Sequence, residues 1–237
     1  MKPCIPDTTG VFVGRVWDAQ YQCPSLVTVR DGIVYDITTA HVKTMSDILD
    51  LDTPTEYVTS VQGTEIMSLT DLQTQSLTAN GDTNTTHLLS PNDLQAVKAC
   101  GVTFAKSMVE RVIEEQAKGD ADKAHAIRAE IAEEIGTNLQ NITAGSVQAQ
   151  HTKQVLIEKG LWSQYLEVGI GPYAEVFTKA QPLSSVGWGM DVGIHPVSNW
   201  NNPEPEIVLA VDSNAVVKGI TLEIGRASCR ERVSSPV

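Results

Sequence analysis

One stretch of sequence decides the expected fold and chemistry: Trp200-Asn201-Asn202-Pro203-Glu204-Pro205-Glu206-Ile207-Val208-Leu209-Ala210-Val211. Its apolar second half predicts a strand. Side chains alternate between the two faces of a strand, so Glu204 and Glu206 share one face and Pro205 takes the other. Two neighbouring carboxylates repel each other, and a hard divalent cation such as Mg²⁺ is the usual partner that removes the repulsion. The alternative is an exposed acidic entrance to the strand.

Further segments accompany this strand in a recognisable order. They are Gly101–Arg111 (GVTFAKSMVER), Ala174–Lys179 (AEVFTK), and Asn201–Val211 followed by the Asp212-Ser213-Asn214 turn. In this order the chain resembles the fumarylacetoacetate hydrolase family, and more narrowly its longer bacterial members that act on sugar-derived 2-oxo acids. The resemblance covers roughly residues 87–222, with a weaker similarity in the first eighty residues.

The resemblance implies a fold and a metal site. The expected fold class is α+β, with a small N-terminal β-rich domain over residues 1–86 and a catalytic domain over residues 87–222. That catalytic domain would be a mixed β-roll with peripheral helices. In the family, the Glu-x-Glu pair and an aspartate on the next strand hold a divalent cation that binds the 2-oxo acid. Glu204 and Glu206 correspond to that pair, so Mg²⁺ is expected, with Ca²⁺ or Mn²⁺ as alternatives.

The third ligand of the family has no counterpart in this chain. After Leu222 the chain reads EIGRASCRERVSSPV, from Glu223 to Val237, which looks like a translated DNA-sequencing adapter. It holds three arginines and a lone cysteine and has no periodic apolar pattern. We therefore expect residues 223–237 to be a non-native tail on a catalytic domain that is incomplete at its C-terminus. The alternative is a natural basic tail.

The resemblance also implies a reaction through a metal-bound enolate of a 2-oxo or 2,4-dioxo acid. Hydrolytic C–C cleavage of an acylpyruvate-like or 2,4-dioxo-3-deoxy sugar acid is expected first. The alternatives are a dehydratase of a 3-deoxy-2-oxo sugar acid and a truncated, inactive fragment. Glu110 is the candidate general base and Lys179 the candidate substrate-binding cation. Alternatively, Glu110 is a solvated helix carboxylate beside Arg111, and the aliphatic stem of Lys179 only covers an apolar face.

Charge and composition limit the partners. The 237 residues carry a formal charge of -12, which repels nucleic acid and anionic membranes, and no basic stripe offsets it. The expected partner is therefore a small-molecule 2-oxo acid. No apolar run approaches the roughly 18 residues of a membrane span, and the N-terminus lacks a secretory signal, so a cytoplasmic protein is expected. The resemblance implies a homodimer in the intact parent.

Local patterns predict the remaining elements. Strands are expected over residues 11–17, 25–30 and 33–37, with an Asp31-Gly32 hairpin turn between the last two. Ser90-Pro91-Asn92-Asp93 has the composition of a helix start. Other expected helices are 44–51, 120–135 and 149–159, and other expected strands are 165–168, 176–178, 187–195, 207–211 and 216–222, the last two joined by a turn at Asn214-Ala215.

Overall fold

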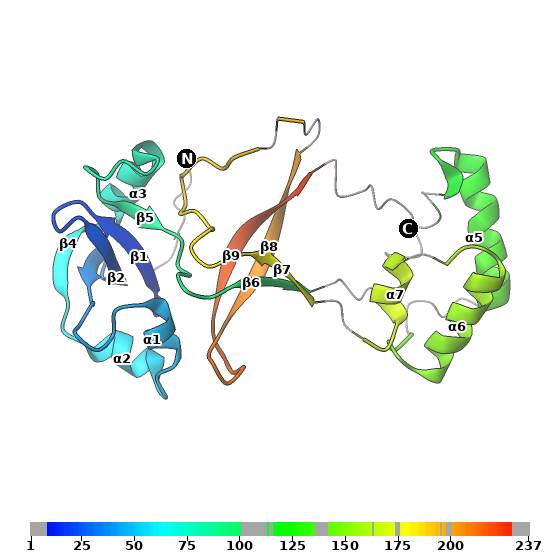
Figure 1. The fold of residues 1–237 in the computed structure, drawn as a ribbon, viewed down its shortest axis with the longest axis horizontal. Helices are drawn as coiled ribbons and strands as arrows, with labels where there is room; N and C mark the ends of the chain where they lie inside the picture. The colour runs from blue at the N-terminus through cyan, green and yellow to red at the C-terminus, as the bar shows by residue number, and fades with distance from the viewer. Residues whose placement is uncertain are drawn as a thin grey trace. The chain divides into compact units, whose positions relative to one another are not determined.

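The computed structural model describes residues 9–100, 113, 116–135, 142–162, 164–173, 176–194, 196–197 and 201–228, without the side chains of 132–135, 164–165, 201–202, 204 and 225–228. The described residues form both helices and strands, which confirms a mixed α+β composition (Figure 1). The chain forms two compact units, Met1–Ala96 with Ala180–Val237, and Val97–Lys179. Each unit is described separately.

The first unit contains a five-stranded antiparallel sheet in the order β4-β3-β2-β1-β5. Its strands are β1 (Val13–Asp18), β2 (Cys23–Arg30), β3 (Ile33–Asp36), β4 (Thr64–Ser68) and β5 (His87–Leu89). The three strands expected near the N-terminus are confirmed. Strand β5 lies just beyond the predicted domain boundary at residue 86 and pairs with β1, so the sheet extends past that point. The division into domains stays a prediction.

The turn between β2 and β3 confirms the Asp31-Gly32 hairpin. Asp31 has φ 49° and Gly32 has φ 78°, and Arg30 pairs with Ile33 across the turn. Two successive positive φ angles match the twist of the flanking strands, and glycine adopts them without steric cost. The two residues therefore fix the register of β2 against β3.

Three helices pack against this sheet: α1 (Met45–Leu49), α2 (Pro54–Ser60) and α3 (Leu69–Ala79). Two of them, α2 and α3, lie in the region 53–86, where only the end of a β-rich domain was expected. Helix α1, which was expected, begins with a capping box: Thr44 accepts from the amide of Asp47, and Asp47 accepts from the amide of Thr44. Its buried side chains Met45, Ile48 and Leu49 join Leu26 and Ile37 in one hydrophobic core.

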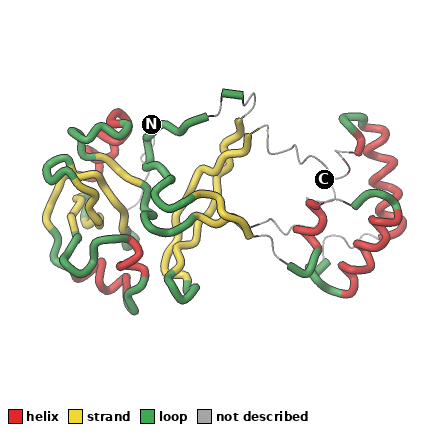
Figure 2. Tube along the Cα trace, in the orientation of Figure 1, coloured by secondary structure: helices red, strands yellow, loops and turns green. Residues whose placement is uncertain are grey.

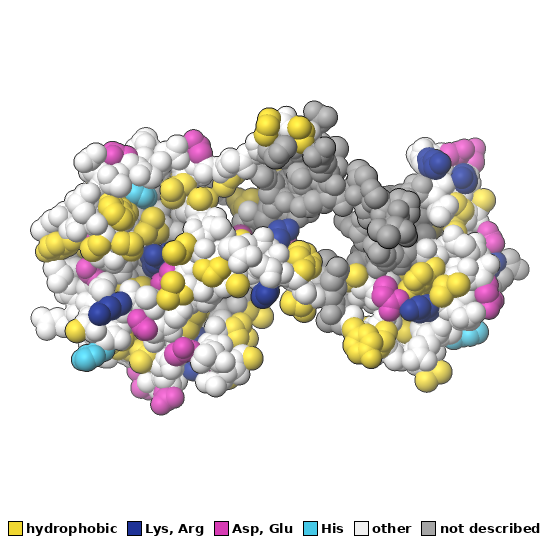
Figure 3. Space-filling view, viewed as in Figure 1, with side chains coloured by type: hydrophobic (Ala, Val, Ile, Leu, Met, Phe, Trp, Pro, Cys, Tyr) yellow, Lys and Arg dark blue, Asp and Glu magenta, His cyan; other side chains and the backbone are white. Residues whose placement is uncertain are grey.

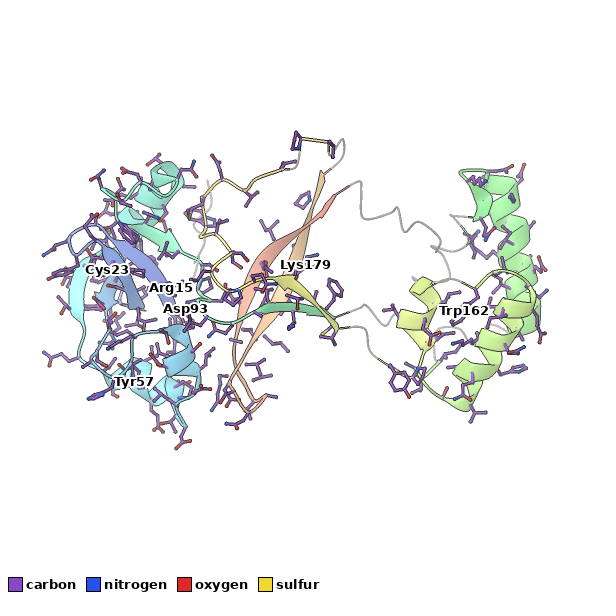
Figure 4. The ribbon with its side chains drawn as sticks, in the orientation of Figure 1. Arg15, Cys23, Tyr57, Asp93, Trp162 and Lys179 are labelled. Atoms are coloured by element: carbon purple, nitrogen blue, oxygen red, sulfur yellow. The ribbon has the colours of Figure 1, made fainter. Side chains whose placement is uncertain are left out.

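No helix begins at Ser90, so that prediction is wrong for the described residues up to 100. Residues 90–96 form bends and irregular backbone, and strand β6 (Val97–Cys100) follows. The reason is the long-range role of Asp93, which is 4% exposed. Its Oδ2 lies 3.5 Å from Nε of Arg15 (Figure 4). The same oxygen accepts a hydrogen bond of 2.7 Å from the amide of Met45, which is the first residue of α1. Arg15 also donates to the carbonyls of Ser90 and Asn92.

The second unit contains the two-stranded pair β6–β7 and three helices. Strand β7 covers Val176–Ala180, and the helices are α5 (Ala121–Ile135), α6 (Val147–Glu158) and α7 (Gln164–Ile170). Strand β7 and helices α5 and α6 confirm their predictions. The strand expected over 165–168 is wrong, because Leu166 and Ile170 lie one helical turn apart and are both buried. A short apolar run does not distinguish a strand from a buried helix by periodicity alone.

Strands β8 (Asn201–Val211) and β9 (Val217–Ser228) form an antiparallel hairpin that belongs to the first unit (Figure 2). Both predicted strands are confirmed and are longer than expected, and β9 continues through residues 223–228. The strand expected over 187–195 is wrong for residues 187–194, which form a loop with a turn. A Cβ on Gly187 would lie 2.0 Å from the carbonyl oxygen of Leu88, so this loop packs against the backbone of β5.

The strands assigned to a catalytic β-roll form two separate two-stranded sheets, β6–β7 and β8–β9, within the described residues. The roll implied by the family resemblance is therefore not confirmed. None of the helices in the described part of the chain is both long and apolar enough to span a lipid bilayer.

Removal of the Asp93 carboxylate is expected to destabilise the first unit strongly. Asp93→Ala leaves the buried Arg15 guanidinium without its counter-ion and the amide of Met45 without its acceptor, so we expect a loss of about 3–5 kcal/mol in the free energy of unfolding. Urea denaturation measures this loss. The control Glu65→Ala removes an exposed carboxylate of β4 and is expected to change stability by less than about 0.5 kcal/mol. Equal losses in the two variants would contradict the assigned role of Asp93.

The turn between β8 and β9 predicts a pH dependence. The Asp212 carboxylate accepts from the amides of Val216 and Asn214, both at 2.8 Å, and lies 3.5 Å from Nζ of Lys218. The hydrogen bond from Val216, followed by those from Asn214 and Lys218, lowers the pKa of Asp212 below its ordinary value. A lowered pKa in the folded state stabilises the hairpin above the unfolded pKa of about 4, and this stabilisation is lost as the pH falls through the folded pKa.

We therefore expect Asp212→Asn to be less stable than the wild type at pH 7 and equally stable at a pH well below 3 to 4. Thermal unfolding of the two proteins across this pH range measures the difference. If the stability difference between the wild type and Asp212→Asn stays constant as the pH falls, the negative charge of Asp212 does not stabilise the turn.

Candidate functional site

The four residues expected to carry the chemistry lie in different parts of the chain. Glu110 lies outside the described residues. Glu204 is described for its backbone alone, as part of β8. Glu206 lies on the same strand and is half-buried, and Lys179 lies on β7 in the second unit (Figure 4). Only Glu204 and Glu206 are therefore brought together within one described element.

The register of the hairpin places a further carboxylate beside this pair. Glu206 lies opposite Glu223 of β9, and Glu204 lies opposite Gly225. Residues that face each other in an antiparallel pair project to the same side of the sheet, so Glu204, Glu206 and Glu223 take positions on one face. Like charges directly opposite each other destabilise a strand pair. This end of the hairpin therefore concentrates negative charge that a cation would neutralise.

The two faces of the hairpin differ in exposure. Glu206, Val208 and Ala210 on one face are half-buried, whereas Ile207 and Leu209 on the other are 74% and 54% exposed. The face that carries Glu206 is therefore the more protected one, which favours a bound ion over a freely solvated carboxylate pair.

Two prolines restrict how β8 can pair. Pro203 and Pro205 alternate with the two glutamates, so both of their nitrogens, which carry no hydrogen, face the same edge of the strand. A proline in a ladder is tolerated when its nitrogen faces away from the partner strand. A shift of the pairing register by one residue would rotate β8 about its axis. Both proline nitrogens would then point toward β9, and the two glutamates would move to the other face. The prolines therefore favour the register that keeps Glu206 on the protected face.

The hairpin is fastened to the first unit at its turn. The amide of Ser213 donates to Oδ1 of Asp50 at 2.8 Å, and Nζ of Lys218 donates to the carbonyl of Leu51 at 3.1 Å. Ala210, on the same face as Glu206, packs against the core of α1, α2 and the sheet. Contacts with the residues at the end of α1 and the start of the next turn therefore explain why this face of the hairpin is less exposed.

The residues that could hold a metal fit a hard cation by their chemistry. Carboxylate oxygens are the ligands that Mg²⁺, Ca²⁺ and Mn²⁺ prefer. Among the described side chains, no lysine or arginine forms an ion pair with Glu206 or Glu223. The same side chains contain no group of three or more His, Cys, Asp or Glu arranged to hold a metal, but that set excludes the side chain of Glu204. The donor type fits, and the ligand set stays a prediction.

Lys179 has a local environment that suits an anion contact. Its ammonium lies 5.9 Å from the centroid of the Phe177 ring, and the side chain is half-buried. On the neighbouring strand β6, Lys98 donates to the hydroxyl of Thr178 at 2.6 Å. The β6–β7 pair thus carries two ammonium groups, each next to an uncharged side chain. Lys179 and Glu206 belong to different units, and each is described within its own.

Sequence reasoning missed the position of Glu223, although a signal for it existed. In a hairpin whose turn is centred between Asn214 and Ala215, the residue numbers of each cross-strand pair add up to the sum of 214 and 215. Glu206 and Glu223 have this sum, so they are expected to lie opposite each other. The residue was set aside because the segment from Glu223 onward was interpreted as a tail.

Comparison with known proteins gives a short match. The 2-dehydro-3-deoxy-D-arabinonate dehydratase of Saccharolobus solfataricus is 40% identical to this chain over 48 residues. The match covers 20% of this chain and 16% of that protein, so the chain spans far less than two thirds of its relative. No family model matches the chain, and no solved structure matches it significantly.

Proposed function

We propose that this chain belongs to a divalent-metal-dependent enzyme that dehydrates a 3-deoxy-2-oxo sugar acid. The observation that carries the proposal is that Glu204, Glu206 and Glu223 take positions on the same face of the β8–β9 hairpin, the more protected of its two faces. The similarity to a sugar-acid dehydratase supports dehydration over the other reactions that such a site could serve. Hydrolytic C–C cleavage, expected first from the sequence, stays a prediction.

Glu204 and Glu206 would hold the cation, with Glu223 as a further carboxylate on the same face. Two carboxylates alone leave a six-coordinate ion incomplete, so water and substrate oxygens would supply the remaining ligands. A divalent cation held there supplies Lewis-acid polarisation of the substrate carbonyl. The half-buried position of Glu206 lowers the local dielectric and strengthens each charge interaction at the site.

The remaining chemistry requires proton transfer and charge pairing by the protein. Dehydration of a 3-deoxy-2-oxo acid removes a proton from C3 and expels a hydroxyl group, so it needs a base and an acid. Glu110 is the proposed base. Lys179 is the proposed partner of the substrate carboxylate, because an ammonium group donates charge-assisted hydrogen bonds to a carboxylate. Each role can be tested separately by substitution.

Metal binding is tested by thermal unfolding with and without Mg²⁺ or Mn²⁺. At a metal concentration about 100 times the dissociation constant we expect a stabilisation of about 2.7 kcal/mol, or roughly 5–10 °C in Tm. Glu206→Gln keeps the size of the side chain and removes its charge, so we expect the metal affinity to fall by at least about 100-fold. At the same metal concentration the stabilisation should then fall to about 0.4 kcal/mol or less.

The matched control is Glu65→Gln, which alters an exposed strand carboxylate outside the hairpin. We expect this variant to keep the full metal-dependent shift. A shift of equal size in Glu206→Gln and the wild type would contradict the metal site. A metal site without turnover of any 3-deoxy-2-oxo sugar acid would leave the site intact and contradict the dehydratase assignment.

A further inference from the structure

The sequence contains one Asn-Gly dipeptide, Asn80-Gly81, and it lies at the C-terminal end of α3. Asparagine loses its side-chain amide most readily in this dipeptide, because glycine has no side chain to hinder attack by its backbone nitrogen. Asn80 has φ 43° and ψ 41°, and Gly81 has φ 84°. These two left-handed residues end the helix in a tight turn, in which the amide of Asp82 donates to the carbonyl of Ala79 at 2.8 Å.

A loop of the same unit holds this turn. The amide of Asp191 donates to Oδ1 of Asn80 at 2.9 Å, and Nδ2 of Asn80 donates to Oδ2 of Asp191 at 2.8 Å. A Cβ on Gly81 would lie 3.5 Å from the terminal methyl group of Met190, so the loop contacts both residues of the dipeptide. We call the contact of residues 190–191 with residues 80–81 the loop clamp.

The clamped conformation is unreactive. Loss of the amide begins when the backbone nitrogen of Gly81 reaches Cγ of Asn80. This approach requires the Cα–Cβ bond of Asn80 and the peptide C–N bond to be nearly eclipsed about the Cα–C bond. The tetrahedral geometry of Cα means that a ψ of 41° points these two bonds in nearly opposite directions. The two hydrogen bonds with Asp191 also hold the side-chain amide in place. The fold therefore keeps a labile dipeptide in a conformation that cannot react.

We propose that Asn80 is a site of intramolecular deamidation whose rate is set by opening of the loop clamp. When the clamp opens, the backbone nitrogen of Gly81 forms a bond to Cγ of Asn80 and gives its proton to water or hydroxide. The bond from Cγ to Nδ2 breaks, and Nδ2 takes a proton from solvent and leaves as ammonia. Water then opens the succinimide ring at either carbonyl, which gives aspartate or isoaspartate. No atom changes its oxidation state, so water is the only co-reactant.

The product cannot rebuild the clamp. A carboxylate still accepts from the amide of Asp191, but it has no hydrogen to donate to Oδ2 of Asp191. Two carboxylates within hydrogen-bonding distance repel each other. Acidic side chains lie scattered among uncharged and basic ones over the face drawn in Figure 3, whereas the new carboxylate would face another one directly. Deamidation therefore opens the clamp permanently and removes this attachment of the loop to the end of α3.

The rate is tested by peptide mapping with mass spectrometry during incubation of the full chain in mildly alkaline buffer. Asn80 of the folded wild type is expected to deamidate at least about tenfold more slowly than in concentrated urea, because the reaction requires opening of the clamp. Asp191→Ala removes the acceptor of Nδ2 and is expected to raise the rate in the folded protein at least about fivefold. Circular dichroism confirms that this variant is folded.

The control for this variant is Glu65→Ala, which removes an exposed carboxylate of β4 and is expected to leave the rate at Asn80 unchanged. Equal rates in the folded and the urea-unfolded wild type would overturn the proposal. An unchanged rate in folded Asp191→Ala, or an Asn80 that stays intact in urea, would overturn it as well.

The consequence is tested by Asn80→Asp, which reproduces the aspartate product. Hydrogen exchange of the Asp191 amide, followed by NMR, is expected to become at least about tenfold faster in this variant. The matched control Asn84→Asp makes the same change of charge in the following turn, where the Asn84 amide bonds to Asp82, and is expected to keep the wild-type exchange rate. Wild-type exchange in Asn80→Asp would overturn the proposal. So would equal acceleration in both variants, because added charge and not the clamp would then control the loop.

Discussion

The alternation of proline and glutamate at the start of β8 is the constraint on which the candidate site depends. Pro203 and Pro205 cannot donate to the ladder, so β8 pairs with β9 in the orientation that turns their nitrogens away from it. The same orientation places Glu204 and Glu206 on one face and Ile207, Leu209 and Val211 on the other. One short segment thereby determines both the acidic face and the apolar face of the hairpin.

The opposite end of the hairpin determines which of these faces is protected. Asp212 organises the turn, Ser213 and Lys218 bond to the residues that follow α1, and Ala210 packs into the core beneath them. The N-terminal sheet and its helices thus serve as the platform on which the hairpin is mounted. This platform relies on the buried pair of Arg15 and Asp93, since Asp93 also binds the first amide of α1.

Local signals in the sequence predicted local structure well. The Asp31-Gly32 turn, helix α1, helices α5 and α6 and the β8–β9 hairpin each depend on residues near one another in the chain, and each was predicted. The failures involve long-range contacts. Asp93 was expected to cap a helix that starts at Ser90, but its carboxylate binds Arg15 and the amide of Met45 instead. Leu166 was expected on a strand, but it is a buried residue of a helix whose short apolar run resembles a strand. The pairing of Glu206 with Glu223 could have been derived from the position of the turn but was not predicted. The protection of that face could not, because it depends on Asp50 and Leu51, about 160 residues away in sequence.

The most direct test of this account is paramagnetic broadening of backbone amide signals by Mn²⁺ in NMR spectra of the full chain. If the hairpin register and the carboxylate face are both correct, substoichiometric Mn²⁺ broadens the amides of Glu204 and Glu206 and of Glu223 to Gly225 most strongly, and the effect weakens along both strands toward Asp212. Strongest broadening at another acidic surface, or on one strand alone, would contradict it.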